Sequence, residues 1–424
     1  MSKKISLGAA IAFMAITAAV TLTITMIFSM RSFTDRVYSL KEREGMYKKY
    51  SEIDRWVRQN YNGTIDEDAL MDAVASGYLA GLNDPYARYY TAEEYAQLSQ
   101  TLDGTVAGLG ISTALDASGY MIVTEVYPDS PAEGVIPVGA LIVKIDDLDV
   151  TKDNYDQAVA LLTGEAGTKV ELTIRQNDED IALSPLTRRN VTRPTVYSRM
   201  INQTAYIRIS EFSDSTTVQF SQAISEAVSN GAKALIFDVR ENGGGTIKSV
   251  SAILDQLLPQ GDIVSATYGD GSTEVLYTSD ANQVELPMIV LGNENTASAS
   301  ELFIQALRDY NKATFVGVNT MGKGSMQETF KLSDGSAIQL TVALYNPPKS
   351  ENFDQVGLKP DYEVQLSSSL QDILFELDEN TDTQLKKALE LSELAIRSAE
   401  EAQQGQDSSG ASESSAEESS DSSN

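Results

Sequence analysis

A long apolar run at the amino end constrains this chain most. No charged residue occurs between Lys4 and Arg31, and residues 5–30 are mainly Ala, Ile, Leu, Met, Phe, Thr and Val. The run exceeds the ~20 apolar residues with which a helix spans a bilayer. It ends without the small-x-small pattern of a signal-peptidase site, so an uncleaved anchor is favoured over a cleaved signal. We expect residues 1–31 to form a cytoplasmic stub and a transmembrane anchor.

The charges beside this run bear on the location of the rest of the chain. Lys3 and Lys4 favour a cytoplasmic amino end, although several basic residues follow the run as well: Arg31, Arg36, Lys41, Arg43, Lys48 and Lys49. Long domains translocate largely regardless of flanking charge. We therefore expect a single-pass protein of the cell membrane with an extracytoplasmic body, a location that the absence of Cys permits without requiring.

Two absences limit the chemistry of the body. The 424 residues include no His and no Cys, which excludes a Ser-His-Asp triad, a thiol nucleophile and a Cys/His zinc site. Catalysis would have to use Ser, Thr, Tyr, Lys, Arg or carboxylates. The net charge of −29 opposes binding to nucleic acid, because such binding requires Lys and Arg to replace counterions.

The hydrophobic pattern changes along the body. Apolar residues recur at helical spacing to about Leu82, short strands with turns follow from Met121, and strands alternate with helices from about Val191 to Leu366. The alternation is typical of an α/β unit of catalytic size. Residues 367–403 are helical in character, whereas residues 404–424 are rich in Ser and acidic residues and too poor in apolar residues to fold.

Lys323 is the first candidate for chemistry. Residues 317–324 match a phosphate-binding loop except at its last position, but a hairpin pattern follows where that loop requires a helix, so nucleotide binding is disfavoured. A surface lysine in a glycine turn is the simplest alternative. A Lys held in a dry cleft could instead act as a base, provided that its pKa falls by about three units. Lys323 would then be buried, with a Ser hydroxyl as its natural partner.

Ser298 is the candidate for that partner. The segment Glu294 to Glu301 follows a buried strand and opens an amphipathic helix, a geometry that exposes a nucleophile beside backbone N–H groups. Ser298-x-x-Glu301 is also a helix capping box, and the spacing alone favours capping. The chain lacks Ser-x-x-Lys and Gly-x-Ser-x-Gly, which excludes the penicillin-binding and α/β-hydrolase templates.

A glycine-rich turn is the third candidate. Leu235 to Val239 forms a buried strand, and the chain continues Arg240-Glu-Asn242-Gly-Gly-Gly245. The turn is either a flexible loop or a backbone that presents N–H donors to a developing oxyanion. Asp238 and Arg240 are more suited to holding this loop than to touching a substrate.

Together these motifs resemble the carboxyl-terminal processing (tail-specific) proteases, a serine peptidase family with an embedded PDZ domain. The resemblance spans about residues 83–366, although Met321 replaces the usual aromatic residue before Gly-Lys-Gly, and Gly243 replaces the usual Pro. It implies a Ser-Lys dyad and an oxyanion hole formed by two backbone amides. The implied residues are Ser298 as nucleophile, Lys323 as general base, Gln327 as the residue that orients Lys323, and Ala299 and Gly244 as oxyanion donors.

The resemblance also divides the chain into domains. It implies a multidomain α/β protein: a helical region at 32–103, a PDZ domain at 104–190 built as a small β-barrel with helices, and a mixed α/β, Clp protease/crotonase-like core at 191–366. The loop that binds a substrate's terminal carboxylate would be Gly108, Leu109, Gly110 and Ile111.

The expected function is therefore serine endopeptidase activity near the carboxyl termini of unfolded or flexible proteins, with the PDZ domain recognising the tail and gating activity. We expect no cofactor and no metal. The helical regions at 34–82 and 367–403 are candidates for homodimerisation by family analogy. One alternative is a catalytically silent PDZ scaffold that delivers tails to another protease. A second is a metal-dependent hydrolase, which would have to rely on carboxylates alone.

Overall fold

A computed structural model of the chain describes residues 8, 13, 14, 17, 21, 44–116, 119–371 and 373–417. The chain forms two units, Met1–Val74 and Ala75–Asn424, which are treated separately below. Among the described residues, no helix is both long and apolar enough to cross a membrane. The anchor predicted at residues 1–31 lies outside the described residues, apart from five single positions.

The described part of the predicted amino-terminal helical region, residues 44–103, is mainly helical but also contains the strand β1 (Arg88–Tyr90). One helix occupies residues 44–60, and α2 (Glu67–Ala80) begins in the first unit. Arg58 of the first helix links it to α2 through an ion pair with Glu67 (2.6 Å), and pairs with Asp54 within its own helix (2.8 Å). The first helix also exposes large apolar side chains: Tyr47, Tyr50, Ile53, Trp56 and Val57.

The predicted PDZ region is a small β structure with one helix. Its main sheet has the order β3-β4-β5-β8-β9, and β2 pairs separately with β11. Buried residues of the central strands, among them Met121, Ile142 and Ile145, belong to one hydrophobic cluster. The elements are β2 (Thr105–Gly108), β3 (Ile111–Leu115), β4 (Met121–Val126), β5 (Leu141–Ile145), β6 (Leu148–Asp149), α4 (Tyr155–Leu162), β7 (Lys169–Val170), β8 (Leu172–Gln176), β9 (Glu179–Ala182), β10 (Leu186–Thr187) and β11 (Arg189–Thr192).

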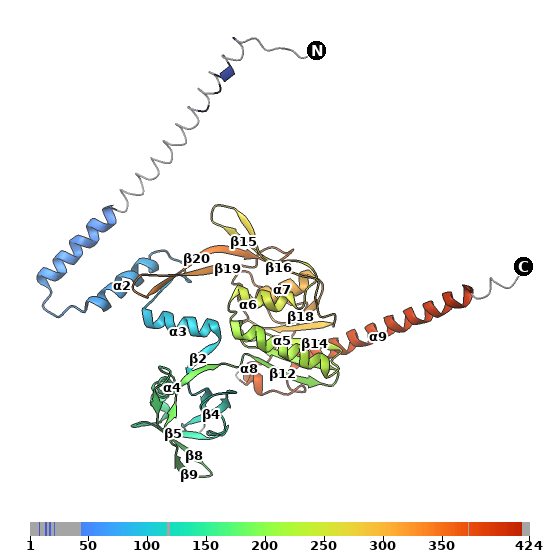
Figure 1. Cartoon of the computed structure of the whole chain (residues 1–424), viewed down its shortest axis with the longest axis horizontal. Coiled ribbons are helices and arrows are strands. Elements are labelled where there is room, and N and C mark those ends of the chain that lie inside the picture. The colour runs from blue at the N-terminus through green and yellow to red at the C-terminus, as the bar shows by residue number, and fades with distance from the viewer. Residues whose placement is uncertain are drawn as a thin grey trace, which may run out of the picture. The chain divides into compact units, whose positions relative to one another are not determined.

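The core is built on a sheet of order β12-β13-β14-β17-β18-β21, parallel from β13 onward (Figure 1). Its central strands β14 and β17 are fully buried and carry a nearly continuous apolar run, as strands covered on both faces do. The strands are β12 (Val196–Ile201), β13 (Thr204–Ile209), β14 (Ala234–Asp238), β17 (Met288–Gly292), β18 (Ala313–Gly317) and β21 (Tyr362–Glu363), and the helices between them are α5 (Asp214–Ser229), α6 (Ile247–Asp255) and α7 (Ala299–Asp309).

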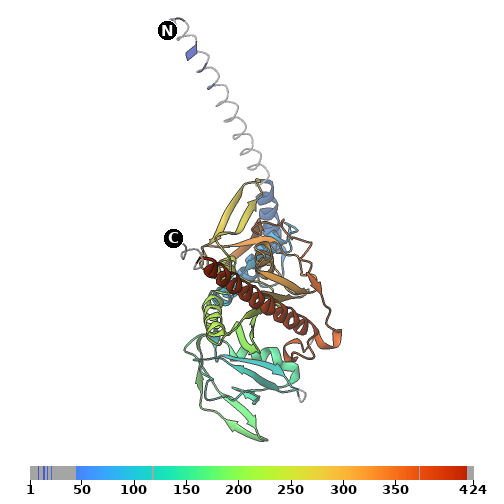
Figure 2. The same cartoon turned by 90° about the vertical axis from the view of Figure 1, so that its right-hand side faces the viewer.

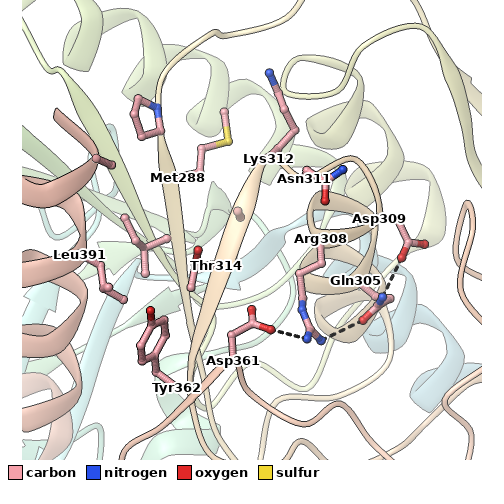
Figure 3. A pocket seen from close by; sticks show the side chains of 14 residues that line it. Met288, Gln305, Arg308, Asp309, Asn311, Lys312, Thr314, Asp361, Tyr362 and Leu391 are labelled. Carbon is pink, nitrogen blue, oxygen red and sulfur yellow. Dashed lines mark hydrogen bonds and ion pairs between the residues drawn. The ribbon is translucent and has the colours of Figure 1, made fainter. Parts of the chain in front are cut away.

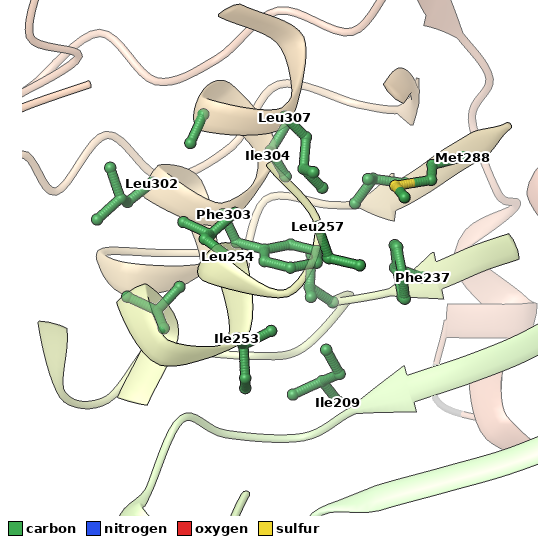
Figure 4. Packing of buried hydrophobic residues seen from close by; sticks show 14 of the residues in the cluster. Ile209, Phe237, Ile253, Leu254, Leu257, Met288, Leu302, Phe303, Ile304 and Leu307 are labelled. Carbon is green, nitrogen blue, oxygen red and sulfur yellow. The ribbon is translucent and has the colours of Figure 1, made fainter. Parts of the chain in front are cut away.

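The helices α5, α6 and α7 cover one face of this sheet. Figure 4 shows residues of α6 and α7 packed with Phe237 of β14. Phe237 on β14 meets Phe303 on α7 edge to face, with 5.4 Å between ring centroids. Ile253 and Leu257 from the α6 region fill the same cluster and are fully buried. This packing fixes the amino end of α7 against the carboxyl ends of the strands, which is where loops carry functional residues in such sheets.

A second sheet stands beside the first and has the order β1-β20-β15-β16, with β19 paired to β20. The hairpin predicted after Lys323 is confirmed as β19 and β20. The hairpin of β15 and β16 was not predicted, because most of β16 is exposed and carries little hydrophobic pattern. The elements are β1 (Arg88–Tyr90), α3 (Ala92–Asp103), β15 (Gly261–Tyr268), β16 (Thr273–Ser279), β19 (Ser325–Lys331) and β20 (Ala337–Asn346).

The carboxyl-terminal segment differs from the prediction. Two short helices, α8 (Ser368–Gln371) and η2 (Leu374–Glu376), precede a long helix α9 (Thr383–Glu417). Residues 404–417 are therefore helical where we predicted an unfolded tail, because the hydrogen bonds of a helix are local and do not require an apolar sequence. Residues 418–424 lie outside the described residues. Leu385 and Ala388 of α9 are buried on the second face of the sheet. Figure 2 shows α9 as the long red helix.

Candidate active site

Ser298 occupies the sharp turn between β17 and α7. Its backbone has φ 57° and ψ −121°, a conformation that costs free energy for a residue with a side chain. The Ser298 N–H donates to Glu301 Oε2 (2.9 Å), which is the Glu301 half of the predicted capping box, but the Ser298 hydroxyl makes no capping hydrogen bond. The half-buried hydroxyl is thus available for chemistry, in the strand-turn-helix geometry predicted from the sequence.

The glycine-rich turn packs directly against the Ser298 turn. Gly244 has φ +108°, and a Cβ added to it would lie 2.9 Å from Ser298 Cβ and 3.0 Å from the Ala299 nitrogen. Only glycine permits this approach. Ala299 is the first residue of α7, where a backbone N–H has no acceptor within the helix and can bind a negative charge.

The Gly244 N–H does not have the predicted role of an oxyanion donor in this structure. It donates to Asn242 Oδ1 (2.8 Å), and the buried Asn242 is itself fixed by donating to the Ile209 carbonyl oxygen (2.9 Å). Its neighbours Gly243 and Gly245 are exposed and line the cavity described below. These flanking amides are therefore better placed than Gly244 to face a substrate.

Lys323 lies in the loop between β18 and β19. It is half-buried, and burial lowers the pKa of its amino group, which is the direction a base requires. Its Nζ lies 4.6 Å from the centroid of the Tyr86 ring. Among the described residues, no carboxylate forms an ion pair with Lys323. The prediction that Lys323 is buried is thus partly confirmed.

Gln327 lies on β19 and lines the same cavity as Lys323. Its amide nitrogen donates to Ser325 Oγ (3.0 Å) and Thr341 Oγ1 (3.2 Å). The structure therefore brings Gln327 near the base but commits its amide to other partners, and the predicted orienting contact is not made in this arrangement.

Glu301 ties the two catalytic loops together, a role that the sequence pattern did not indicate. Its carboxylate is fully buried and accepts from the backbone N–H groups of Ser298 (2.9 Å) and Lys323 (2.8 Å). It also accepts from Gly322 N–H (2.7 Å) and Thr320 Oγ1 (2.5 Å). One carboxylate thereby fixes the backbone of Ser298 and that of Lys323, the candidate nucleophile and base, relative to each other.

Tyr345 on β20 is the second residue that the sequence pattern missed. Its side chain is fully buried, and its hydroxyl donates to the Lys323 carbonyl oxygen (2.6 Å). Burial raises the pKa of this phenol, and a hydrogen bond with the Ser298 side chain opposes the rise. Tyr345 therefore contacts both loops and remains neutral at physiological pH.

A cavity of about 710 Å³ brings Ser298 and Lys323 together. Gln327 and Tyr345 also line it, and an apolar wall completes it: Leu98, Leu102, Ile247, Leu276 and Met326. Such a mixture of a few polar groups and an apolar wall suits a peptide chain. Among the described residues, no group of three or more acidic side chains is arranged to hold a metal.

A second cavity, of about 660 Å³, lies at the opposite, amino ends of β17 and β18 (Figure 3). Its Arg308 is neutralised by an ion pair with Asp361 (2.6 Å). Neither Ser298 nor Lys323 lines it, so we assign the chemistry to the first cavity.

Comparisons with known proteins agree with this site. The model of peptidase family S41 matches residues 203–364, and that of the PDZ domain matches residues 122–176. The carboxy-terminal processing protease CtpA of Bacillus subtilis (strain 168) is 30% identical over 83% of this chain and 76% of its own length. The chain belongs to peptidase family S41. It is a serine-type peptidase with a PDZ domain.

Other members of the family extend the comparison. A carboxyl-terminal-processing protease of Synechocystis sp. is 32% identical over 68% of this chain and 69% of its own length. A solved structure described as a putative S41 protease from Bacteroides fragilis superposes with a TM-score of 0.51, at 19% identity, over 80% of this chain and 96% of that one. The latter match supports the S41 peptidase fold.

In this S41 peptidase, a buried arginine anchors the glycine-rich turn. Arg240 is 2% exposed and forms ion pairs with Asp238 (2.6 Å) and with Asp382 (2.8 Å), which directly precedes α9. Burial opposes the charge of Arg240, but the two carboxylates outweigh it and raise the pKa of the guanidinium. Asp238 and Arg240 thus hold the loop, as the sequence suggested.

The predicted carboxylate loop of the PDZ domain joins β2 to β3. Gly108 ends β2, Ile111 begins β3, and Gly110 has φ +71°. The Leu109 side chain is buried in the domain core, so only the backbone of this residue could meet a ligand. The free edge of β3 is partly covered, because the Tyr155 hydroxyl donates to the Thr113 carbonyl oxygen (2.9 Å).

Proposed function

We propose that this S41 peptidase is a membrane-anchored, extracytoplasmic endopeptidase that cleaves proteins near their carboxyl termini with a Ser298–Lys323 dyad. The PDZ domain would recognise the substrate tail through the loop from Gly108 to Ile111 and gate the activity. The observation that carries this proposal is the shared cavity, in which a strained serine and a partly buried lysine lie on two loops joined by Glu301.

The chemistry follows from these groups. Neutral Lys323 removes the proton of Ser298 Oγ as that oxygen attacks the peptide carbonyl carbon, and the resulting oxyanion is held by backbone N–H groups of Ala299 and the glycine-rich turn. The Lys323 ammonium then protonates the leaving amine. Water, deprotonated by Lys323, then attacks the acyl carbon; the ester bond to Ser298 breaks, and the Lys323 ammonium returns a proton to Ser298 Oγ. The first proton transfer requires the Lys323 amine, which lies on the Tyr86 ring, to approach the Ser298 hydroxyl.

The test compares single substitutions in the full-length protein. An unfolded protein substrate is incubated, with chelator present, with wild type, Ser298→Ala and Lys323→Ala. We expect cleavage by wild type alone. Ser300→Ala and Lys331→Ala serve as matched controls, because Ser300 is a buried neighbour of Ser298 and Lys331 lies exposed at the end of β19; both should cleave normally.

Each alternative has its own result. Cleavage that survives either catalytic substitution would exclude the dyad. Binding of a tail peptide without cleavage by any form would favour the PDZ scaffold. Cleavage by wild type that chelator abolishes would favour a metal-dependent hydrolase.

The membrane location rests on the uncharged run at residues 5–30. We expect the full chain to sediment with membranes and to resist extraction by salt or carbonate, whereas a chain starting at residue 32 should be soluble. Protease added to intact cells from which any wall has been removed should reach the body. We also propose that two copies of the chain associate through the exposed apolar residues of helix 44–60. Light scattering should then give twice the monomer mass.

A further inference from the structure

Tyr86 makes the one ring contact with the Lys323 amine among the described residues, and it comes from a distant part of the chain. Lys323 Nζ lies 4.6 Å from the centroid of the ring, close enough for a cation–π interaction. Tyr86 lies just before β1, far from both catalytic loops in sequence.

The backbone around Tyr86 is firmly positioned. Tyr86 N–H donates to Asp84 Oδ1 (2.9 Å), and the Gln339 amide of β20 donates to the Tyr86 carbonyl oxygen (3.2 Å). The strand β1 that follows pairs with β20. Because β20 also carries Tyr345, which binds the Lys323 carbonyl oxygen, one strand positions both the ring and the backbone of the lysine.

The surroundings keep the ring neutral. Burial raises the pKa of the Tyr86 phenol, and the nearby carboxylates of Asp354, Asp84 and Glu301 raise it further. The charged groups that face Tyr86 are therefore these acids and Lys323 itself. A neutral ring face attracts an ammonium more strongly than an amine, since the attraction depends on the positive charge.

We propose that Tyr86 is a positioning residue for the general base: its ring holds Lys323 as an ammonium, away from Ser298, when no substrate is bound. This inference rests on the proposed dyad. Loss of the proton weakens the hold of the ring and frees the amine to reach Ser298. The ring and the serine hydroxyl thus compete for one side chain, with protonation deciding between them.

The test replaces the ring and measures kcat/KM against pH. In Tyr86→Leu the ammonium loses its partner and the lysine deprotonates more readily, so the acid limb should move to lower pH. At a pH on the acidic side of the wild-type limb, kcat/KM of Tyr86→Leu should exceed that of wild type about two- to tenfold, the factor that a cation–π contact supplies. Tyr86→Phe keeps the ring and should reproduce the wild-type profile.

A second readout does not depend on cleavage. In the Ser298→Ala background, the pH dependence of Lys323 modification by an amine-reactive reagent, followed by mass spectrometry, reports the ionisation of the lysine directly. Tyr86→Leu should shift this dependence to lower pH, and Tyr86→Phe should not.

The outcomes separate the two ideas. An unchanged labelling profile in Tyr86→Leu, a shift to higher pH, or an equal shift in Tyr86→Phe would overturn the role of the ring. Cleavage that survives Lys323→Ala would instead overturn the dyad, while the labelling result would still decide whether Tyr86 holds the lysine.

Discussion

At the scale of single residues, the buried Glu301 carboxylate has the greatest consequence. Its two oxygens accept hydrogen bonds from both catalytic loops, and a glutamine would replace one acceptor with a donor that faces backbone N–H groups. We predict that Glu301→Gln lowers kcat by at least about 100-fold and the free energy of unfolding by about 3 kcal/mol. Steady-state kinetics and denaturant unfolding measure the two effects. A fully active Glu301→Gln enzyme would show that the bridge is dispensable.

The two adjacent glycines of the turn should respond differently to the same substitution. A Cβ on Gly244 would press on Ser298 Cβ at 2.9 Å, in a left-handed conformation, whereas a Cβ on Gly243 would meet nothing within 4 Å. We predict that Gly244→Ala abolishes measurable cleavage and that Gly243→Ala retains activity within about threefold of wild type. Equal activities in a peptide assay would contradict the close approach on which the turn depends.

The residues that the sequence identified, and those it missed, differ in a physical way. Ser298 and Lys323 could be predicted because each lies in a short sequence motif that indicates its chemistry. Glu301 looked like a helix cap because its second set of partners lies about 20 residues away, across a strand. Tyr86 and Tyr345 acquire their contacts with Lys323 only when β1, β19 and β20 assemble, which no local pattern reveals.

At the scale of elements, strands and helices with strong periodicity were predicted well, and the β15–β16 hairpin was not.

In the PDZ domain, the free edge of β3 is the element to which a peptide could bind. A peptide that adds to β3 as a strand needs the Thr113 carbonyl as an acceptor, and Tyr155 on α4 now donates to it.

We therefore predict that Tyr155→Phe tightens tail binding. Removal of this hydroxyl frees the Thr113 carbonyl, and the Kd of a labelled carboxyl-terminal peptide should fall about threefold to tenfold. Fluorescence anisotropy in the Ser298→Ala background measures binding without cleavage. Thr113→Val is the matched control, because it removes only the contact between the two hydroxyls (3.1 Å) and leaves the carbonyl covered. Weaker binding by Tyr155→Phe would assign the hydroxyl to ligand recognition.

At the scale of the whole molecule, the carboxyl-terminal helix belongs to the catalytic core. The sequence placed a boundary at residue 366 because the α/β alternation ends there. The structure instead buries Leu385 and Ala388 against the second face of the sheet. Asp382, which directly precedes α9, also pairs with Arg240 beside the glycine-rich turn. The sequence could not indicate this pairing, since the two residues are far apart in the chain.

Two truncations follow from this arrangement. A chain ending at residue 381 uncovers the apolar face of the sheet and leaves buried Arg240 with Asp238 alone, so we predict a loss of stability on the order of 5 kcal/mol, together with loss of cleavage. A chain ending at Gln403 keeps Asp382 and every residue of α9 whose side chain is described as buried, and should match wild type in melting temperature and activity. Asp382→Asn separates packing from charge. It keeps the helix packed but removes one of the two negative charges that neutralise Arg240, so it should lower stability less than the first truncation while still reducing kcat. If the chain ending at residue 381 melted and cleaved like wild type, α9 would be an appendage, and the glycine-rich turn would have to be held from β14 alone.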